Sequence, residues 1–152
     1  MSDARWLNEQ EMRAWRSLQF MQMRLEGALA RQLAADSNLS YPDYLVLVTL
    51  TDQRDGRMRL FELAAALGWE KSRVSHQVAR MAARNLVAKK KCDSDGRGAF
   101  VVVSAHGRRE IDAAAPGHVD AVRRLFIDQI STEQLNAITD VAEVVLATLD
   151  KL

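Results

Sequence analysis

One stretch of the sequence, GWEKSRVSHQVARM (residues 68–81), is rich in hydrogen-bond donors and poor in acidic partners. If Val74, Val78 and Met81 form the buried side of a helix, at spacings of four and three, the donors occupy its other sides. These donors are Lys71, Ser72, Arg73, Ser75, His76, Gln77 and Arg80. A solvated helix face usually mixes both charge signs, but no carboxylate follows Glu70 here. We therefore expect this face to bind an external polyanion; a plainly solvated cationic face is the alternative.

The residue types on this face suit contacts with DNA. Arg73 can donate two hydrogen bonds to guanine O6 and N7, and Gln77 can pair with adenine N6 and N7. Ser72 and His76 lie in the same half of the helix and are expected to face base edges as well. Phosphate contacts, which orient a protein without specifying sequence, are expected for Lys71, Ser75 and Arg80.

A second basic element follows in DSDGRG (residues 93–98), between the runs LVAKKK (86–91) and AFVVV (99–103). Two short runs around a glycine-bearing turn predict a β-hairpin. Arg97 is expected at its tip, where an extended arginine can enter the minor groove. Asp95 could orient Arg97 or tie the loop to the body of the protein. The alternative is a plain structural turn, because an Asp-Gly turn followed by an unpaired arginine is common.

The elements that hold these residues can be read from apolar spacing. SYPDYLVLVTL begins a helix with Ser40 as N-cap, which runs to about Gln53. Residues 60–68 form a short helix that stops at Gly68, and the donor-rich helix follows almost at once. A helix–turn–helix followed by a hairpin is a winged helix, in which the second helix enters the major groove and the first braces it.

Long helices are predicted at both ends of the chain. Residues 9–35 are apolar on two nearly opposite sides, one with Trp15, Leu18, Leu25, Leu29 and Leu33, the other with Phe20, Met23, Gly27, Ala30 and Ala34. Ser104 caps a helix that Pro116 should kink or interrupt. Ser131 and Gln134 form a capping box before a last helix with an apolar seam. A helix apolar on two sides must be covered twice, so we expect a second subunit.

The predicted fold class is therefore mainly α (α+β). Residues 54–103 are expected to form a winged helix-turn-helix DNA-binding region. This region is embedded between the terminal helices. Residues 1–53 together with 104–152 are expected to form an intertwined helical dimerisation region.

Charge is distributed unevenly along the chain. The net charge of +1 predicts no partner, but residues 54–97 hold eleven basic and five acidic side chains, which leaves +6 there and −5 elsewhere. A basic centre between acidic ends indicates a localised polyanion-binding face, unless the clustering is chance. No apolar run approaches the roughly 20 residues of a membrane span, and no signal peptide is recognisable. We therefore expect a cytoplasmic protein without membrane contact.

Other candidate sites carry less information. No nucleophile–base pair, phosphate-binding glycine loop or metal-ligand spacing is present, so no enzyme activity, cofactor or metal is expected. Cys92, the only cysteine, lies beside Lys91 and is either a redox-sensitive thiol or a bystander. A small aromatic effector could bind among a cluster of aromatic and methionine side chains; the alternative is that these side chains belong to the core. The cluster consists of Trp15, Met21, Met23, Tyr41 and Tyr44.

The chain resembles the MarR family of bacterial transcription regulators in three features. These are the order of its elements, the segment LAAALGWEKSRVSHQVARM and the wing DGRGAFVVVSAHGRR. The resemblance covers nearly the whole chain and is most specific from Leu60 to Arg108. It implies a triangular homodimer that binds an operator through two winged helices and is usually released by a small phenolic or other aromatic ligand, or by cysteine oxidation. Glu70 stands where the family often has a small capping residue, and the first helix lacks the cysteine of the redox-sensing branch.

Together these observations predict a homodimeric, sequence-specific DNA-binding regulator. It is expected to repress from a pseudo-palindromic operator on double-stranded DNA and to be released by a small aromatic effector. The alternative is a winged helix that serves as a protein–protein interaction module without DNA binding.

Overall fold

Side-chain caps mark the starts of several helices of this protein. In the computed structural model, which describes residues 3–91 and 99–152, Ser40 and Ser131 each accept a hydrogen bond from the backbone amide three residues on. In both cases the side chain at that position bonds back to the cap, so both are full capping boxes. Asn8 and Glu11 form a third one, which starts the first helix.

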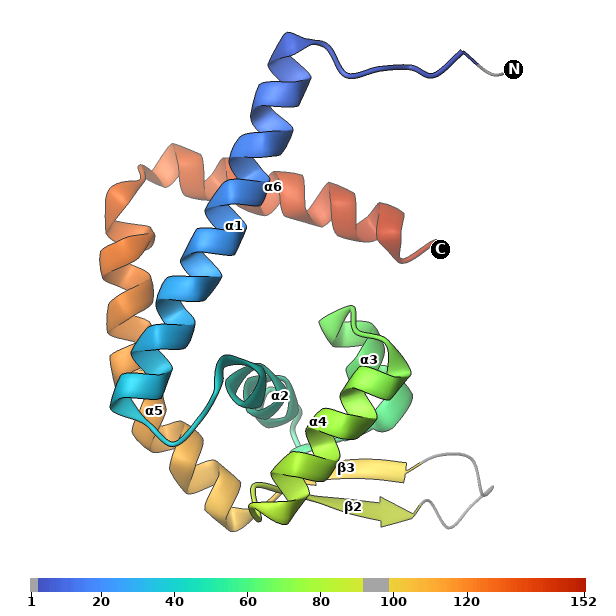
Figure 1. Ribbon diagram of the computed structural model, residues 1–152, viewed down its shortest axis with the longest axis vertical. Helices are drawn as coiled ribbons and strands as arrows, with labels where there is room; N and C mark the ends of the chain where they lie inside the picture. The colour runs from blue at the N-terminus through green and yellow to red at the C-terminus, as the bar shows by residue number, and fades with distance from the viewer. Residues whose placement is uncertain (1–2, 92–98) are drawn as a thin grey trace.

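The described chain is mainly helical with one small sheet, as predicted (Figure 1). The helices are α1 (Glu9–Asp36), α2 (Tyr41–Thr51), α3 (Leu60–Leu67), α4 (Lys71–Ala83), α5 (Ala105–Leu125), the 3-10 turn η1 (Ile127–Gln129) and α6 (Thr132–Leu149). The strands are β1 (Arg57–Arg59), β2 (Val87–Lys91) and β3 (Ala99–Val103). Among the described residues, no helix is long and apolar enough to cross a membrane.

The core lies between α2, α3, α4 and the sheet, and Leu33 of α1 and Ile111 of α5 also belong to it. The predicted inner stripe of α4, formed by Val74, Val78 and Met81, is completely buried. Leu47 of α2 and Leu63 of α3 belong to the same cluster. Gly68 ends α3 in the left-handed conformation, with φ of 65°, which a residue without a Cβ adopts at little cost. The predicted helix–turn–helix is confirmed, and α2 is part of its core.

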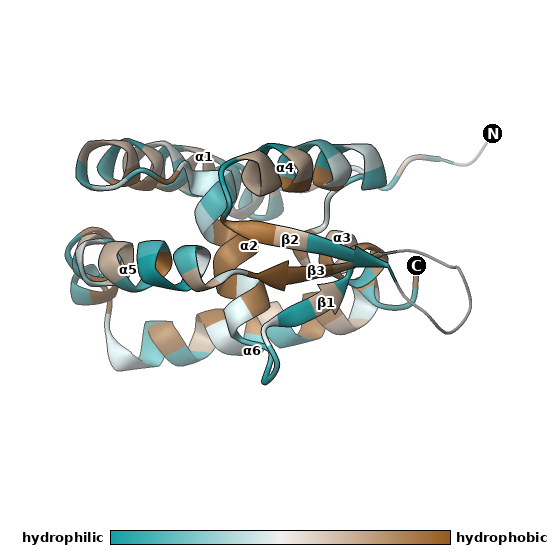
Figure 2. Ribbon diagram, turned by 90° about the horizontal axis from the view of Figure 1, so that it is seen from below, coloured by the Kyte–Doolittle hydropathy of each residue, from teal (hydrophilic) through white to brown (hydrophobic). Residues whose placement is uncertain are grey.

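The sheet has one strand more than the sequence indicated. Its order is β1-β3-β2, and β1 pairs antiparallel with β3, with Met58 opposite Val101. Figure 2 views this sheet face-on, with α4 along one side of it. The three residues of β1 include a single apolar side chain, Met58, so no alternating pattern marks the strand. Residues 57–59 are a strand only because they pair with the apolar strand β3.

Of the kink or interruption expected at Pro116, the interruption is wrong, because α5 continues through this residue to Leu125. The helix packs along α1, and a Cβ on the neighbouring Gly117 would lie 3.4 Å from Nε2 of Gln32 on that helix. Tertiary contacts of this kind hold the helix together across the one backbone hydrogen bond that proline cannot make.

The terminal helices leave large apolar surfaces uncovered. No residue of α6 is buried, and its Val141 and Val144 are 62% and 69% exposed. On α1, Phe20 and Met23 are 58% and 60% exposed. In Figure 1, α1 extends upward away from the winged-helix end of the molecule, whereas α6 runs across the view above that end.

Candidate nucleic-acid interface

The outer face of α4 carries most of the donors that the sequence assigned to it. Its inner stripe is fixed in the core, so most of the remaining positions point outward. Those that are exposed are Lys71, Ser72, Arg73, His76 and Arg80, whereas Ser75 is half-buried. Glu70 precedes the helix as N-cap without a side-chain capping bond. The structure thus brings together five donors on one exposed helix surface.

Gln77 is not among them, and its predicted place on the exposed face is wrong. The residue is 5% exposed, and its Nε2 donates to Oδ1 of Asp43 on α2 over 2.6 Å. It lies between the inner stripe and the outer face, and a buried carboxylate draws its amide inward, since buried polar groups need partners. In this position its amide cannot pair with an adenine edge.

Asp43 is the acidic partner that the local sequence of α4 lacks. It is 2% exposed, and its Oδ2 accepts hydrogen bonds from Nη1 of Arg84 at 2.6 Å and from the backbone nitrogen of Ser40 at 2.9 Å. Arg84 also donates to the carbonyl oxygen of Asn38. Sequence reasoning missed this because the partners lie 34 and 41 positions away from Asp43. The one available signal was an acidic residue in the first turn of an apolar helix.

Arg73 is held against an aromatic ring in the free protein. Its guanidinium carbon lies 4.0 Å from the ring centroid of Trp69, which lies in the turn between α3 and α4. At this distance the cation is attracted by the ring face, which restricts an otherwise flexible side chain. The predicted base-reading arginine therefore starts from a defined position beside α4.

The sheet adds basic side chains. Lys89, Lys90 and Lys91 of β2 are exposed. On the other edge, the guanidinium groups of Arg57 and Arg59 lie 4.6 and 5.1 Å from the ring centroid of Phe100. The predicted wing residues Asp95 and Arg97, and Cys92 at its base, lie outside the described residues.

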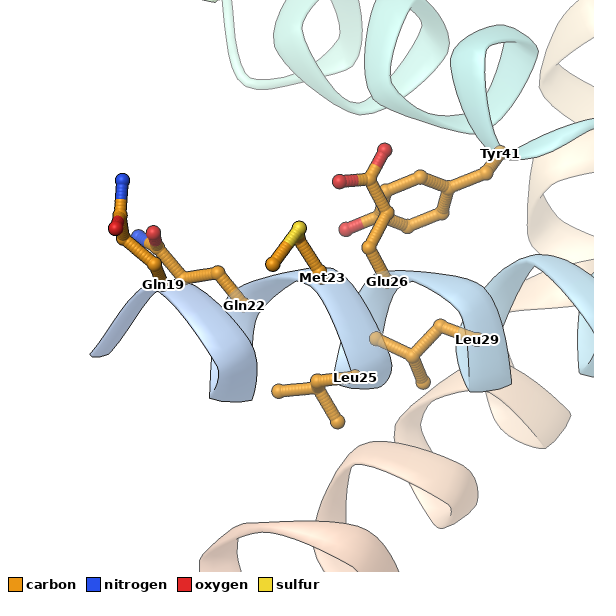
Figure 3. Close-up of a pocket in the computed structure, with 7 residues that line it drawn as sticks. All are labelled: Gln19, Gln22, Met23, Leu25, Glu26, Leu29 and Tyr41. Atoms are coloured by element: carbon orange, nitrogen blue, oxygen red, sulfur yellow. The ribbon is translucent and has the colours of Figure 1, made fainter. Parts of the chain in front are cut away.

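The residues expected to bind an effector do not form one cluster. Met23 and Tyr41 line an open cavity of about 620 Å³ between α1 and α2, shown in Figure 3 with Glu26 beside the Tyr41 ring. Met21 and Met23 line a second one, of about 810 Å³, between α1 and the end of α5. Trp15 lines neither and is 52% exposed, whereas Tyr44 is core at 7% exposed. The prediction that these five residues line a single pocket is therefore wrong. The side chains from α1 point to different sides of that helix.

His118 of α5 packs against the aromatic side chains at the start of α2. Its ring centroid lies 4.2 Å from that of Tyr44 and 6.4 Å from that of Tyr41. Burial lowers the pKa of His118 and raises that of Tyr44. Burial, and then the nearby charge of Glu26, raise the pKa of Tyr41. Nδ1 of His118 has no hydrogen-bond partner among the described residues.

Comparison with known proteins adds independent information. A MarR family model matches residues 37–98, whereas no curated protein sequence matches the chain. AbsC, a MarR family transcriptional regulator from Streptomyces coelicolor, is 37% identical, with 98% of this chain and 100% of that chain covered and a TM-score of 0.89. Sco3205, a MarR family regulator from the same organism solved in complex with DNA, is 35% identical over 98% and 93% of the two chains, also with a TM-score of 0.89.

A more distant match has a bound ligand. CouR from Rhodococcus jostii RHA1, solved with p-coumaroyl-CoA, is 26% identical over 84% of this chain and 87% of that chain, with a TM-score of 0.73. The near-complete coverage by AbsC and Sco3205 extends the match from the winged helix to the terminal helices. The chain belongs to the MarR family of transcriptional regulators.

Proposed function

We propose that this protein is a homodimeric regulator that binds a pseudo-palindromic operator sequence-specifically and represses transcription. The observation that carries the proposal is the exposed donor face of α4, on a helix whose opposite side is locked in the core. Arg73 and His76 would face base edges, and Lys71 and Arg80 would contact phosphates. The 35% identity to Sco3205, which was solved with DNA, supports this use of the face.

The homodimer is supported by the uncovered apolar side chains of α1 and α6. A monomeric soluble protein rarely exposes contiguous apolar surface of this extent. We assign residues 1–53 and 104–152 to the dimerisation region and residues 54–103 to the DNA-binding region, with α2 packed into the core of the latter. Two copies would then present two α4 helices to successive half-sites.

Release by a small aromatic effector completes the proposal. Its support is the cavity lined by Met23 and Tyr41, and the fact that CouR was solved with p-coumaroyl-CoA. An aromatic ligand at this cavity would contact the first turn of α2, which also holds Asp43. A shift of that turn would be transmitted to α4 through the side chains bonded to Asp43.

Selection of bound sequences from a random duplex pool tests the proposal. A palindromic consensus is expected, because two symmetry-related α4 helices read two inverted half-sites. Binding to the selected duplex should weaken steeply with salt, with a log–log slope of roughly −5 to −9 if each half-site neutralises about three to five phosphates. No enrichment and a slope near zero would favour the protein-interaction module instead.

A further inference from the structure

A chain of hydrogen bonds runs from the first turn of α2 to the exposed face of α4. Asp43 accepts from Nε2 of Gln77 at 2.6 Å, and Oε1 of Gln77 in turn accepts from Nη2 of Arg80 at 2.9 Å. The chain thus begins at a side chain that is 2% exposed and ends at an exposed arginine.

The direction of this chain is fixed by the chemistry of its buried end. Asp43 is held by Arg84 and by the backbone nitrogen of Ser40, both on Oδ2. An ionised carboxylate only accepts hydrogen bonds, so Gln77 must turn its amide nitrogen toward Oδ1. Its amide oxygen then points the other way, and an arginine is a donor that can meet it. The orientation of Gln77 therefore determines where the guanidinium of Arg80 can rest.

We propose that Gln77 and Asp43 are positioning residues for DNA binding, which hold Arg80 ready for a phosphate without touching DNA themselves. The proposal rests on the function proposed above. A free arginine side chain loses rotamer freedom when it binds a phosphate, and this cost opposes binding. Ordering Arg80 beforehand removes part of the cost, so the free protein is already arranged for its ligand. The relay acts on affinity and carries no sequence information.

A double-mutant cycle on the selected duplex tests the relay. Gln77→Met keeps the approximate shape of the side chain and removes both hydrogen bonds, so it should weaken DNA binding about three- to tenfold while Arg80 is present. In an Arg80→Ala background the same change should cost less than about twofold, because there is no guanidinium left to position. A purely structural role of Gln77 would give the same loss in both backgrounds, and that result would overturn the proposal.

Lys71→Ala supplies the matched background. Lys71 is also expected to contact phosphate, but among the described residues it has no hydrogen bond or ion pair with Gln77. Gln77→Met should therefore keep its full effect there. A wild-type protein that binds no duplex would refute the proposed function and the relay with it. If Arg80→Ala weakened binding, but Gln77→Met cost the same with and without Arg80, the relay alone would be refuted.

If Gln77→Met fails to fold, a measurement on the wild-type protein can still test whether Arg80 is held in place before DNA binds. Nitrogen-15 NMR of arginine side chains reports how freely each guanidinium moves. The guanidinium of Arg80 should be ordered in the absence of DNA, in contrast to that of the exposed Arg109 on α5. An Arg80 side chain as mobile as that of Arg109 would contradict the proposed preorganisation.

Discussion

His118 packs against two tyrosines of α2, and its environment disfavours a charge. Burial lowers the pKa of His118 below its ordinary value of 6.5. The folded state therefore binds a proton less readily than the unfolded chain does. The resulting stabilisation is present above pH 6.5 and is lost as the pH falls from there through the folded-state pKa.

The first prediction concerns this residue. When the pH is lowered from about 7.5 to about 5.5, the thermal midpoint of the wild-type protein should fall further than that of His118→Gln, which cannot titrate in this range. Thermal unfolding of both proteins in the two buffers measures the difference. Identical pH dependence in the two proteins would mean that the His118 ring is as well solvated in the folded chain as in the unfolded one.

Residue type alone was a good guide to some side chains of α4 and a poor one to others. Lys71, Arg73 and His76 are exposed as predicted, because the inner stripe of the helix leaves them no other place. Gln77 lies at the border of that stripe, where helical periodicity does not decide between inside and outside. The hydrogen bond to the Asp43 carboxylate of α2 turns Gln77 inward, and no local pattern in α4 reveals that partner.

At the scale of elements, the junction between the winged helix and α5 depends on close approach of backbone. The hydroxyl of Ser104 accepts a hydrogen bond from the amide of Gly107 at 2.9 Å and donates to the carbonyl oxygen of Leu86 at 3.0 Å. A Cβ on Gly107 would collide with that same carbonyl oxygen. A backbone atom so tightly bonded cannot easily move away.

We therefore expect Gly107→Ala to lower the free energy of unfolding by about 1–3 kcal/mol, as overpacking does. Gly117→Ala in the same helix is the control, since a Cβ there meets only the ends of two flexible side chains. It should be neutral or stabilise by up to about 1 kcal/mol through helix propensity. Chemical denaturation measures both. Equal effects of the two changes would show that the junction tolerates a Cβ.

Elements with local signals were predictable, and those that depend on distant partners were not. The first residues of α2 and α6 follow from capping boxes, which involve residues three positions apart. The strand β1 exists through its pairing with β3, more than forty positions later. The continuity of α5 through Pro116 likewise depends on packing against α1. In both cases the deciding contact is absent from the local sequence.

For the whole molecule, the uncovered faces of α1 and α6 make a second copy the central expectation. Light scattering at micromolar concentration should give about twice the 17.1 kDa of one chain. Val144→Glu should shift the mass toward the monomer, because it places a charge in the proposed interface. Since Val144 is 69% exposed in the isolated chain, helix content should be retained. Asn136→Glu, on the polar side of α6, is the control and should remain dimeric.

A wild-type mass of 17.1 kDa would contradict the dimer. A Val144→Glu variant that stays dimeric would instead place the interface elsewhere on the terminal helices.

The central claim is that the exposed face of α4 reads DNA sequence, and a competition assay tests it most directly. Wild-type protein, Arg73→Ala and Lys71→Ala would each be titrated against a panel of single-base variants of the selected operator. Arg73→Ala should cost about 1–3 kcal/mol per half-site and abolish the preference at one base position. Lys71→Ala should weaken binding to all members of the panel alike, as loss of a phosphate contact does. If Arg73→Ala also weakened every sequence equally and left all base preferences intact, Arg73 would not be a reader, and the assignment of this face of α4 would be contradicted.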